Sequence, residues 1–208
     1  MEEMPVKQTE AQKFNRAAKE WGSNIPQKNY DIARQLVGRL QIPEGGAVLD
    51  VACGTGILFS ILKDGNISRY TGIDIADKMV EEFLSVYPQA EVRCADFESE
   101  LPLEGGYDDV IIFNSIPHFN DLDRVFENAY KLLRPSGTFA IAHARTREGL
   151  REHHKKIGHV SGKKHPIPED AELTGLCAKH GFEGVIIEDS EYFFFSCKRE
   201  FLMCREIV

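Results

Sequence analysis

The sequence has few cysteines and no closely spaced pair of them. Five cysteines stand scattered among 208 residues, without any C-x-x-C spacing, at Cys53, Cys94, Cys177, Cys197 and Cys204. An odd number without zinc-like spacing argues against a disulfide framework and against a structural metal site. We therefore expect reduced thiols and no metal, as in a cytoplasmic protein.

Long apolar runs are missing as well. No run approaches the roughly 18 to 20 residues that are needed to cross a bilayer. The opening segment MEEMPVKQTEAQKF is polar and acidic, with nothing like the apolar centre of a secretory signal. A membrane is accordingly not among the partners that we expect.

Positive charge is scarce, because 25 Lys and Arg face 33 Asp and Glu, which gives a net charge of −8. Such a surface repels phosphate backbones, so nucleic acid is excluded as an expected partner. One segment departs from this balance. Residues 145–164 hold seven basic and two acidic residues, a local charge of +5. This segment is either a solvated helix face or a basic lid that attracts an anionic substrate.

The pattern of apolar residues predicts an α/β fold. Two helices are expected first, at 9–21 and 27–40, and apolar runs then alternate with amphipathic helices. The expected strands are 47–53, 70–75, 90–96, 107–114, 137–143, 183–190 and 192–199, and the further helices are 57–63, 76–86, 122–133 and 168–180. Continuously apolar strands between helices indicate a doubly wound, mostly parallel sheet that is covered on both faces. Very few residues separate the last two strands, so these can only form an antiparallel hairpin.

The turn in VLDVACGTG, residues 48–56, lacks two features of phosphate-binding loops. No Lys-Ser/Thr pair follows the glycines, which excludes a Walker loop. Gly54 and Gly56 supply two glycines of the dinucleotide fingerprint, but the third position is Phe59. Asp50 precedes the turn, where a carboxylate would repel a pyrophosphate and attract an ammonium or sulfonium group. The turn therefore favours a cationic cofactor over NAD.

Acids follow the next two strands at useful spacing. Asp74 lies twenty residues after Gly54, where it can accept hydrogen bonds from both hydroxyl groups of a ribose. Asp96 ends the third strand, where it can accept from the exocyclic amine of adenine, with Phe97 beside the ring. A sugar, a base and a positively charged tail thus each find a partner.

Five segments in order resemble the successive motifs of the class I S-adenosylmethionine-dependent methyltransferases. They are VLDVACGTG, YTGIDIADKMV, VRCADFESELP, YDDVIIFNSIPHF and LLRPSGTFAIAH. The chain is most similar to the small-molecule type, with a domain like methyltransferase types 11 and 25. This resemblance implies a Rossmann-like, seven-stranded sheet of order 3-2-1-4-5-7-6, S-adenosylmethionine as cofactor and S-adenosylhomocysteine as product. It also implies that residues 43–208 form the cofactor-binding unit, with the helices of 1–42 covering the site.

The resemblance also implies which residues bind the cofactor. The glycine loop would wrap the methionine end, Asp74 would hold the ribose, and Asp96 with the backbone N–H of Phe97 would meet the adenine. The full set is Asp50, Ala52, Cys53, Gly54, Thr55, Gly56, Asp74, Ile75, Met79, Asp96, Phe97 and Asn114. One position departs from the family, because Ala76 stands where a helix-capping Ser is common. Asp77 is then expected to cap instead.

Two histidines at strand ends, His118 and His143, are the candidate catalytic bases, since an imidazole titrates near neutral pH. Phe14 and Trp21 share one face of the first helix, where they either pack on the core or close the site. His153 and His154 in the basic segment would face the substrate. Although imidazole clusters recruit metals, the spacing of these histidines does not demand one.

We therefore expect methyl transfer to a small metabolite, which would be anionic if the basic segment acts as a lid. The Pro-Pro-aromatic element of DNA amino-methyltransferases is missing, since the corresponding place reads NSIPHF. Two alternatives stay open, a SAM-binding regulator or assembly factor without catalysis and an NAD-dependent oxidoreductase. The methyl acceptor and the oligomeric state, monomer or homodimer, also stay open.

Overall fold

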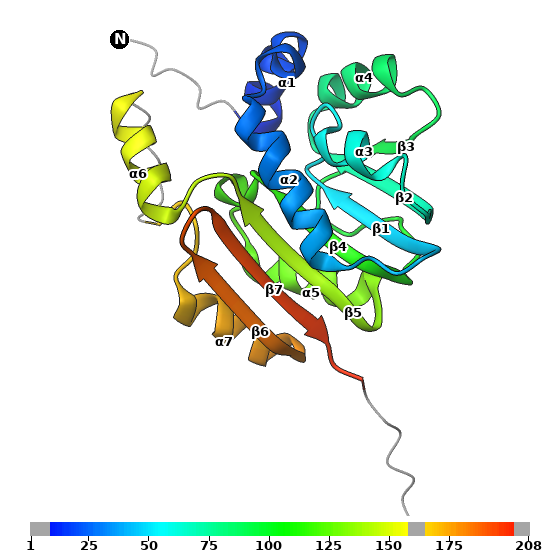
Figure 1. Cartoon of the computed structure of the whole chain (residues 1–208), viewed down its shortest axis with the longest axis vertical. Coiled ribbons are helices and arrows are strands. Elements are labelled where there is room, and N and C mark those ends of the chain that lie inside the picture. Colours follow the sequence, from blue (N-terminus) through cyan, green and yellow to red (C-terminus); the bar gives the residue numbers. More distant parts are fainter. Residues whose placement is uncertain (1–8, 158–164, 202–208) are drawn as a thin grey trace, which may run out of the picture.

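The computed structural model describes residues 9–157 and 165–201 of the chain (Figure 1). Its centre is a seven-stranded sheet of order β3-β2-β1-β4-β5-β7-β6. The strands are β1 (Gly46–Val51), β2 (Ile67–Asp74), β3 (Glu91–Cys94), β4 (Tyr107–Phe113), β5 (Leu133–His143), β6 (Phe182–Asp189) and β7 (Phe193–Arg199). Strands β1 to β5 are parallel, and β7 is antiparallel to both β5 and β6. The predicted strand order and terminal hairpin are confirmed.

Burial explains where the continuous apolar runs lie. The central strands β1 and β4 are buried at every position, because helices cover both of their faces. The edge strands β3 and β6 are mostly exposed and carry charged residues, as edge strands commonly do. Neighbouring strands therefore differ in composition according to their place in the sheet.

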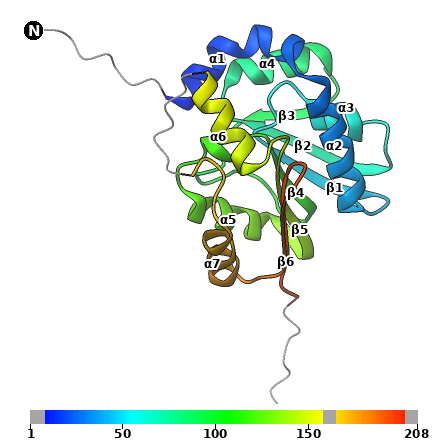
Figure 2. The same ribbon diagram turned by 60° about the vertical axis from the view of Figure 1, so that its left-hand side comes forward.

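Helices pack on the two faces of the sheet (Figure 2). They are α1 (Glu10–Trp21), α2 (Gln27–Leu40), α3 (Ile57–Leu62), α4 (Asp77–Val86), α5 (Leu122–Leu132), α6 (Arg147–Lys156) and α7 (Asp170–His180), with 3₁₀ turns η1 (Gly22–Asn24) and η2 (Ile116–His118). Side chains of α2, α3 and α4 form the core on one face, and those of α5, α6 and α7 form the core on the other. Among the described helices, none is both long and apolar enough to span a membrane.

The predicted helix at 27–40 has the observed bounds of α2, and most other predicted ends are within three residues. Helix α6 is the exception, since a solvated helix face is only one of two alternatives for the basic segment and the sequence gives it no bounds. Its Thr146 caps the helix by accepting from the N–H of Gly149 at 3.1 Å, and Leu150 is its one buried residue. Eight of its ten residues are charged or histidine and Leu150 is its one large apolar residue, so no apolar stripe marks the segment as a helix.

The carboxyl ends of the parallel strands meet at one edge of the sheet. In register, Asp50 of β1 lies beside Ile111 of β4, and Asp74 of β2 lies beside Cys94 of β3. The arrowheads of β1 and β5 point toward this edge, where α1 and α6 also lie (Figure 1). In open α/β sheets, ligands bind outside these carboxyl ends.

Candidate active site

The glycine loop leaves β1 in a conformation that ordinary residues avoid. Ala52, Gly54 and Gly56 have positive φ values of 57°, 53° and 95°. A Cβ atom added to Gly56 would lie 2.7 Å from the ring of Phe83, so only glycine fits there. Ala52 has a side chain, so its left-handed backbone conformation costs free energy. Such strain is common at functional sites.

Phe59, the residue in place of the third fingerprint glycine, is buried in an aromatic cluster on α3. Its ring centroid lies 4.7 Å from that of Tyr70, 5.6 Å from that of Phe83 and 5.1 Å from that of Tyr87. The close packing of helix on strand that the third glycine permits is therefore replaced by a layer of rings. This arrangement weighs against a dinucleotide site.

Asp74 ends β2 directly beneath the glycine loop. One carboxylate oxygen accepts from the N–H of Gly54 at 2.9 Å, and the other accepts from the N–H of Ala76 at 2.9 Å. The side chain is buried, and burial raises its pKa against the lowering effect of these two hydrogen bonds. A carboxylate oxygen can accept more than one hydrogen bond, so Asp74 keeps capacity for a further donor.

Asp50 is buried beside Asp74 at the end of β1. Its carboxyl group accepts a hydrogen bond from the hydroxyl of Tyr70 at 2.7 Å. Burial raises the pKa of Asp50 to about 7, opposed by the Tyr70 hydrogen bond and reinforced by the charge of Asp74. Cys53, the neighbouring thiol, is buried as well, and burial raises its pKa. The end of β1 thus concentrates unneutralised acidic groups.

Of the two apolar side chains expected beside the adenine, Ile75 is exposed and Met79 is buried. Ile75 is 38% exposed, which is unusual for a large apolar side chain, and its carbonyl oxygen lies 3.7 Å from the Cys94 sulfur. Met79 is buried instead, in a small cluster with Ala18, Ala76 and Phe14. Of the two residues expected on the adenine side, only Ile75 presents a surface in this structure.

Asp96 and Phe97 lie in the turn that follows β3. The Asp96 carboxylate accepts from the N–H of Glu98 at 2.9 Å and from the hydroxyl of Ser99 at 3.0 Å. The ring of Phe97 is buried in the main core, where it anchors the turn and offers no face to a base. For Phe97, the backbone is therefore the part that a ligand could meet.

Asn114 follows β4 with a positive φ of 59°, which asparagine tolerates better than most residues. Its side-chain oxygen accepts from the N–H of Ala144 at 2.7 Å, and its own N–H donates to the carbonyl of Ala142 at 2.8 Å. Asn114 therefore ties the end of β4 to the end of β5. Its position beside the glycine loop is fixed by this pairing.

His118 is the predicted histidine that the structure surrounds with partners from α1. Its Nδ1 lies 2.9 Å from a carboxylate oxygen of Glu10, which is 108 residues distant in the sequence. The ring packs edge-on against Phe14 at a centroid distance of 4.8 Å. Phe14 in turn contacts Trp21 edge-on at 5.6 Å, so both predicted lid residues lie on the His118 side of α1.

His143, at the end of β5, is buried. Burial lowers its pKa to about 4, and the charges of Arg145, His118 and His154 add to this lowering. Its Nδ1 lies 3.0 Å from the backbone nitrogen and 3.3 Å from the carbonyl oxygen of Arg145, so it accepts from the N–H in one tautomer and donates to the carbonyl in the other. His143 is therefore a weak base that is neutral at neutral pH.

The basic segment is less positive on its surface than its composition suggests. The guanidinium of Arg147 donates to the carbonyl of Pro168 and pairs with Asp170 at 2.8 Å, so it joins α6 to α7. Arg151 pairs with Glu148 within α6. Burial and the charges of Arg145 and Lys156 lower the pKa of His153. His154 is half-buried beside it, with ring centroids 6.4 Å apart, whereas His159, Lys163 and Lys164 lie outside the described residues.

A metal centre receives no support from the part of the chain that the structure describes. Across residues 9–157 and 165–201, no three His, Cys, Asp or Glu side chains are grouped as metal ligands. Of the histidines at the strand ends, His118 contacts Glu10 and His143 contacts the backbone of Arg145.

Comparison with known proteins relates this chain to methyltransferases. A family model described as a methyltransferase domain matches residues 49–141, from the middle of β1 to β5. The chain has the class I S-adenosylmethionine-dependent methyltransferase fold. S-adenosylmethionine is the cofactor of this family, as the acids and the glycine loop at the carboxyl edge had indicated.

Relatives of the methyltransferase domain differ in what they do. The mitochondrial arginine-hydroxylase NDUFAF5 of Rattus norvegicus is 30% identical over 138 residues, covering 66% of this chain and 37% of its own length. A methyltransferase in complex with the Trm112 activator of Haloferax volcanii has a TM-score of 0.75 at 19% identity, covering 94% of this chain and 100% of its own. Phosphoethanolamine N-methyltransferase 2 of Haemonchus contortus, in complex with S-adenosyl-L-methionine, has a TM-score of 0.66 at 14% identity, covering 82% and 53%. The chain thus spans little more than a third of the length of the hydroxylase that it matches.

One departure from the methyltransferase motifs is repaired from a distance. Ala76 precedes α4 and gives it no side-chain cap, and Asp77 does not act as the cap either. Asn15 of α1 supplies the cap instead, because its side-chain oxygen accepts from the N–H of Lys78 at 3.1 Å while its amide donates to Asp77 at 2.6 Å. The expectation that Asp77 caps this helix is therefore wrong, and its correction explains how α1 is fixed over the site.

Sequence reasoning missed three residues of the candidate site, namely Glu10, Asn15 and Tyr70. Tyr70 is the most detectable, since it opens the quoted YTGIDI strand and a buried tyrosine hydroxyl usually needs a partner. Glu10 and Asn15 read as ordinary polar positions on an amphipathic helix, and no local pattern links them to His118 or Lys78.

Proposed function

We propose that this chain transfers a methyl group from S-adenosylmethionine to a small, anionic acceptor. The observation that carries the proposal is the pair of buried acids, Asp50 and Asp74, beneath the glycine loop. Within residues 9–157 and 165–201, neither carboxyl group forms an ion pair with a basic side chain. A positively charged ligand would lower both pKa values and be held by the resulting carboxylates. S-adenosylmethionine carries such a charge, and a pyrophosphate carries the opposite one.

The residues that would hold the cofactor come from three neighbouring strand ends. Residues 52–56 would receive its methionine end, Asp74 its ribose hydroxyls, and Ile75 one side of its adenine, with the buried Met79 behind it. Asp96 and the N–H of Phe97 would read the edge of the base. When bound, the cofactor supplies a methyl carbon that its positively charged sulfur activates for displacement. The protein then has to align the acceptor and exclude water.

His118 is the proposed general base. The carboxylate of Glu10 lies 2.9 Å from Nδ1 of the ring, where it would stabilise the imidazolium that forms when His118 takes the acceptor's proton. Phe14 holds the ring edge-on, and Trp21 extends the same apolar wall. His143, whose pKa burial lowers to about 4, would form a hydrogen bond with the acceptor rather than remove its proton.

The preference for an anionic acceptor rests on the cations near His153. Arg145 and Lys156 both lower the pKa of this histidine, so their charges act on the same place. Arg147 and Arg151, by contrast, are neutralised by acidic partners. The name of the phosphoethanolamine methyltransferase supports the pairing of this fold with a small, phosphorylated acceptor.

Titration calorimetry with S-adenosylmethionine, S-adenosylhomocysteine and NAD tests the cofactor. We expect the first two to bind and NAD not to bind. Below pH 7 the affinity for S-adenosylmethionine should fall by up to about tenfold per pH unit, because Asp50 must lose a proton when the cation binds. The variant Asp50→Asn should lose this pH dependence, and the exposed Asp64→Asn should keep it. Binding of NAD alone would contradict the proposal.

Methyl transfer itself is measured with labelled S-adenosylmethionine over metabolite pools separated by charge. We expect label in an acidic pool, and a rate about 100-fold lower for His118→Ala with cofactor affinity unchanged. Label confined to cationic or neutral pools would contradict the anionic acceptor.

A second function is favoured by one observation, the 30% identity with an arginine-hydroxylase. That protein's name shows that the fold serves other chemistry, and the Haloferax structure shows a protein with this fold bound to a protein activator. If cofactor binds and no pool accepts label, a role as a SAM-binding factor with a protein partner becomes the better conclusion.

A further inference from the structure

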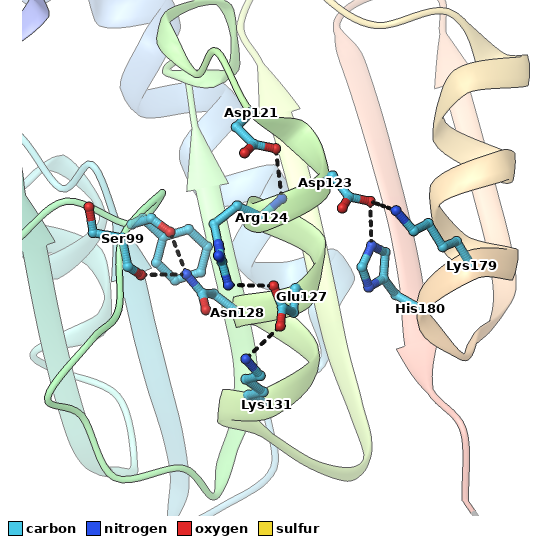
Figure 3. A network of polar contacts seen from close by, with 10 residues as sticks. Ser99, Asp121, Asp123, Arg124, Glu127, Asn128, Lys131, Lys179 and His180 are labelled. Atoms are coloured by element: carbon cyan, nitrogen blue, oxygen red, sulfur yellow. Dashed lines mark hydrogen bonds and ion pairs between the residues drawn. The ribbon is translucent and has the colours of Figure 1, made fainter.

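Helix α5 is hydrogen-bonded to the turn after β3 through the buried side-chain amide of Asn128. The side-chain Nδ2 of Asn128 donates to the carbonyl of Phe97 at 2.8 Å and to the carbonyl of Ser99 at 2.9 Å. Asn128 is only 6% exposed, although its neighbours on α5 form surface ion pairs. Figure 3 shows Asn128 directed at the turn, away from the paired charges of Glu127 and Lys131.

Two more attachments hold the same turn. The ring of Phe97 is buried in the core, and the carboxylate of Glu98 accepts from the N–H groups of Asn120 and Asp121 at the start of α5. The Glu98 contacts lie just before α5, and the Asn128 contacts lie in its middle. One helix therefore fixes both the carbonyl and the side-chain groups of residues 97–99.

The sheet by itself cannot fix this turn. Strand β3 is a four-residue edge strand that pairs only with β2, and three of its residues are exposed. Hydrogen-bond recognition of a base needs donors and acceptors held to within a fraction of an ångström, on side chains and backbone that are locked from behind. At Asp96 and Phe97, that support comes from α5.

We propose that Asn128 is a positioning residue for adenine recognition. By holding the Phe97 and Ser99 carbonyls, it sets the direction of the Phe97 N–H and of the Asp96 carboxylate, which accepts from Ser99 and Glu98 of the same turn. The amide matters because only a side chain with two N–H donors serves both carbonyls at once. An acceptor such as a carboxylate would face two carbonyl oxygens and repel them.

The consequence is selectivity for a base with an amino group. A fixed Asp96 accepts from the 6-amino group of adenine and rejects a 6-oxo base, which presents an acceptor at that place. A loosened turn would meet both bases with similar, weaker affinity. This inference rests on the proposed cofactor and concerns only how its base is distinguished.

The test compares S-adenosylhomocysteine with S-inosylhomocysteine, in which the 6-amino group is replaced by oxygen. Calorimetry on the wild type should show a preference of about tenfold or more for the adenine compound. In Asn128→Leu, which keeps the branched shape and loses the donors, this preference should fall to about threefold or less. Asn128→Ser, with one small donor, should lie between them and serves if the leucine variant does not fold.

Glu127→Gln is the matched control, since it removes the adjacent surface ion pairs and should keep the wild-type preference. Thermal unfolding is measured alongside. A loss of stability with the base preference intact in either Asn128 variant would make Asn128 merely structural and overturn the proposal. A wild type that binds neither compound would overturn the proposed cofactor itself, and the proposal with it. A wild type that binds both equally would overturn base reading at Asp96 while leaving the cofactor standing.

Discussion

Asp50 and Asp74 occupy neighbouring strand ends, where burial raises the pKa of both carboxyl groups. Two acids in a buried site cost free energy unless each is hydrogen-bonded or a cation neutralises them. Tyr70 and the loop N–H groups meet part of this cost. A cationic cofactor would lower the remaining free-energy cost. The same two acids that are unfavourable without a neutralising cation would therefore make the site selective for a cationic ligand.

Cys94 lies at the edge of the same site, so its reactivity can be used to detect a bound ligand. Its side chain is exposed, its sulfur lies 3.7 Å from the Ile75 carbonyl, and burial with the charges of Asp77 and Asp74 raises its pKa. If adenine lies against Ile75, we expect S-adenosylhomocysteine to slow alkylation of Cys94 at least about tenfold, because a bound ligand blocks the exposed state. Iodoacetamide labelling at pH 9, followed by peptide mass spectrometry in a Cys204→Ser background, measures the rate. Equal rates with and without ligand would place the adenine elsewhere.

Among the elements, α1 is docked both by apolar packing and by the polar side chain of Asn15. Phe14 and Ala18 pack on Ala76 and Met79, and Asn15 caps α4 through the N–H of Lys78. Replacing an N-cap residue by alanine costs about 1 kcal/mol. We therefore expect Asn15→Ala to destabilise the docked helix by about 1 kcal/mol and to speed amide exchange in residues 10–21 about fivefold. Exposed Arg16→Ala should leave this exchange unchanged, and unchanged exchange in Asn15→Ala would show that apolar packing alone fixes α1.

Local elements followed from the sequence because their signals are local. Helix α2 was predicted with its observed bounds, since its apolar spacing and the preceding Pro26 lie within one short segment. The order of the strands came from the resemblance to a family, because apolar runs alone do not say which strands pair. Helix α6 was missed as a separate helix, since its sequence REGLREHHKK has almost no apolar stripe.

The site was predicted in part, for a related reason. The acids and glycines of the loop stand at strand ends, and the chain's topology brings strand ends together. The contacts of Asn15 with Asp77, Glu10 with His118 and Asn128 with Phe97 join residues that are 62, 108 and 31 positions apart. Such pairs depend on how helices pack, and polar residues on helix surfaces look alike whether or not they have a distant partner.

At the scale of the whole molecule, stability depends on buried acids at both ends of the sheet. Asp109 lies near the start of β4 and is 2% exposed, and one of its carboxyl oxygens has no hydrogen-bond partner within the described residues. Burial raises its pKa to about 7, aided by the charge of Asp108 and opposed by Arg134 and Lys198. Asp50 at the opposite end is raised to about 7 as well, whereas burial lowers the pKa of His143 to about 4.

These shifts fix the sign of the pH dependence. Between about pH 4 and 7, folded Asp109 holds a proton that the unfolded chain has released, so the free energy of unfolding falls as pH rises. The fall is about 1.4 kcal/mol per pH unit and up to about 4 kcal/mol over the window. Asp50 acts in the same direction, and His143 acts in the opposite direction below pH 6.5. We expect Asp109→Asn to remove the contribution of Asp109 to this pH dependence. Between pH 4.5 and 6.5, the slope of the free energy of urea unfolding against pH should then be more positive than in the wild type by about 1.4 kcal/mol per pH unit. Exposed Asp64→Asn is the control, and parallel slopes for Asp109→Asn and the wild type would mean that Asp109 is ionised in the folded protein.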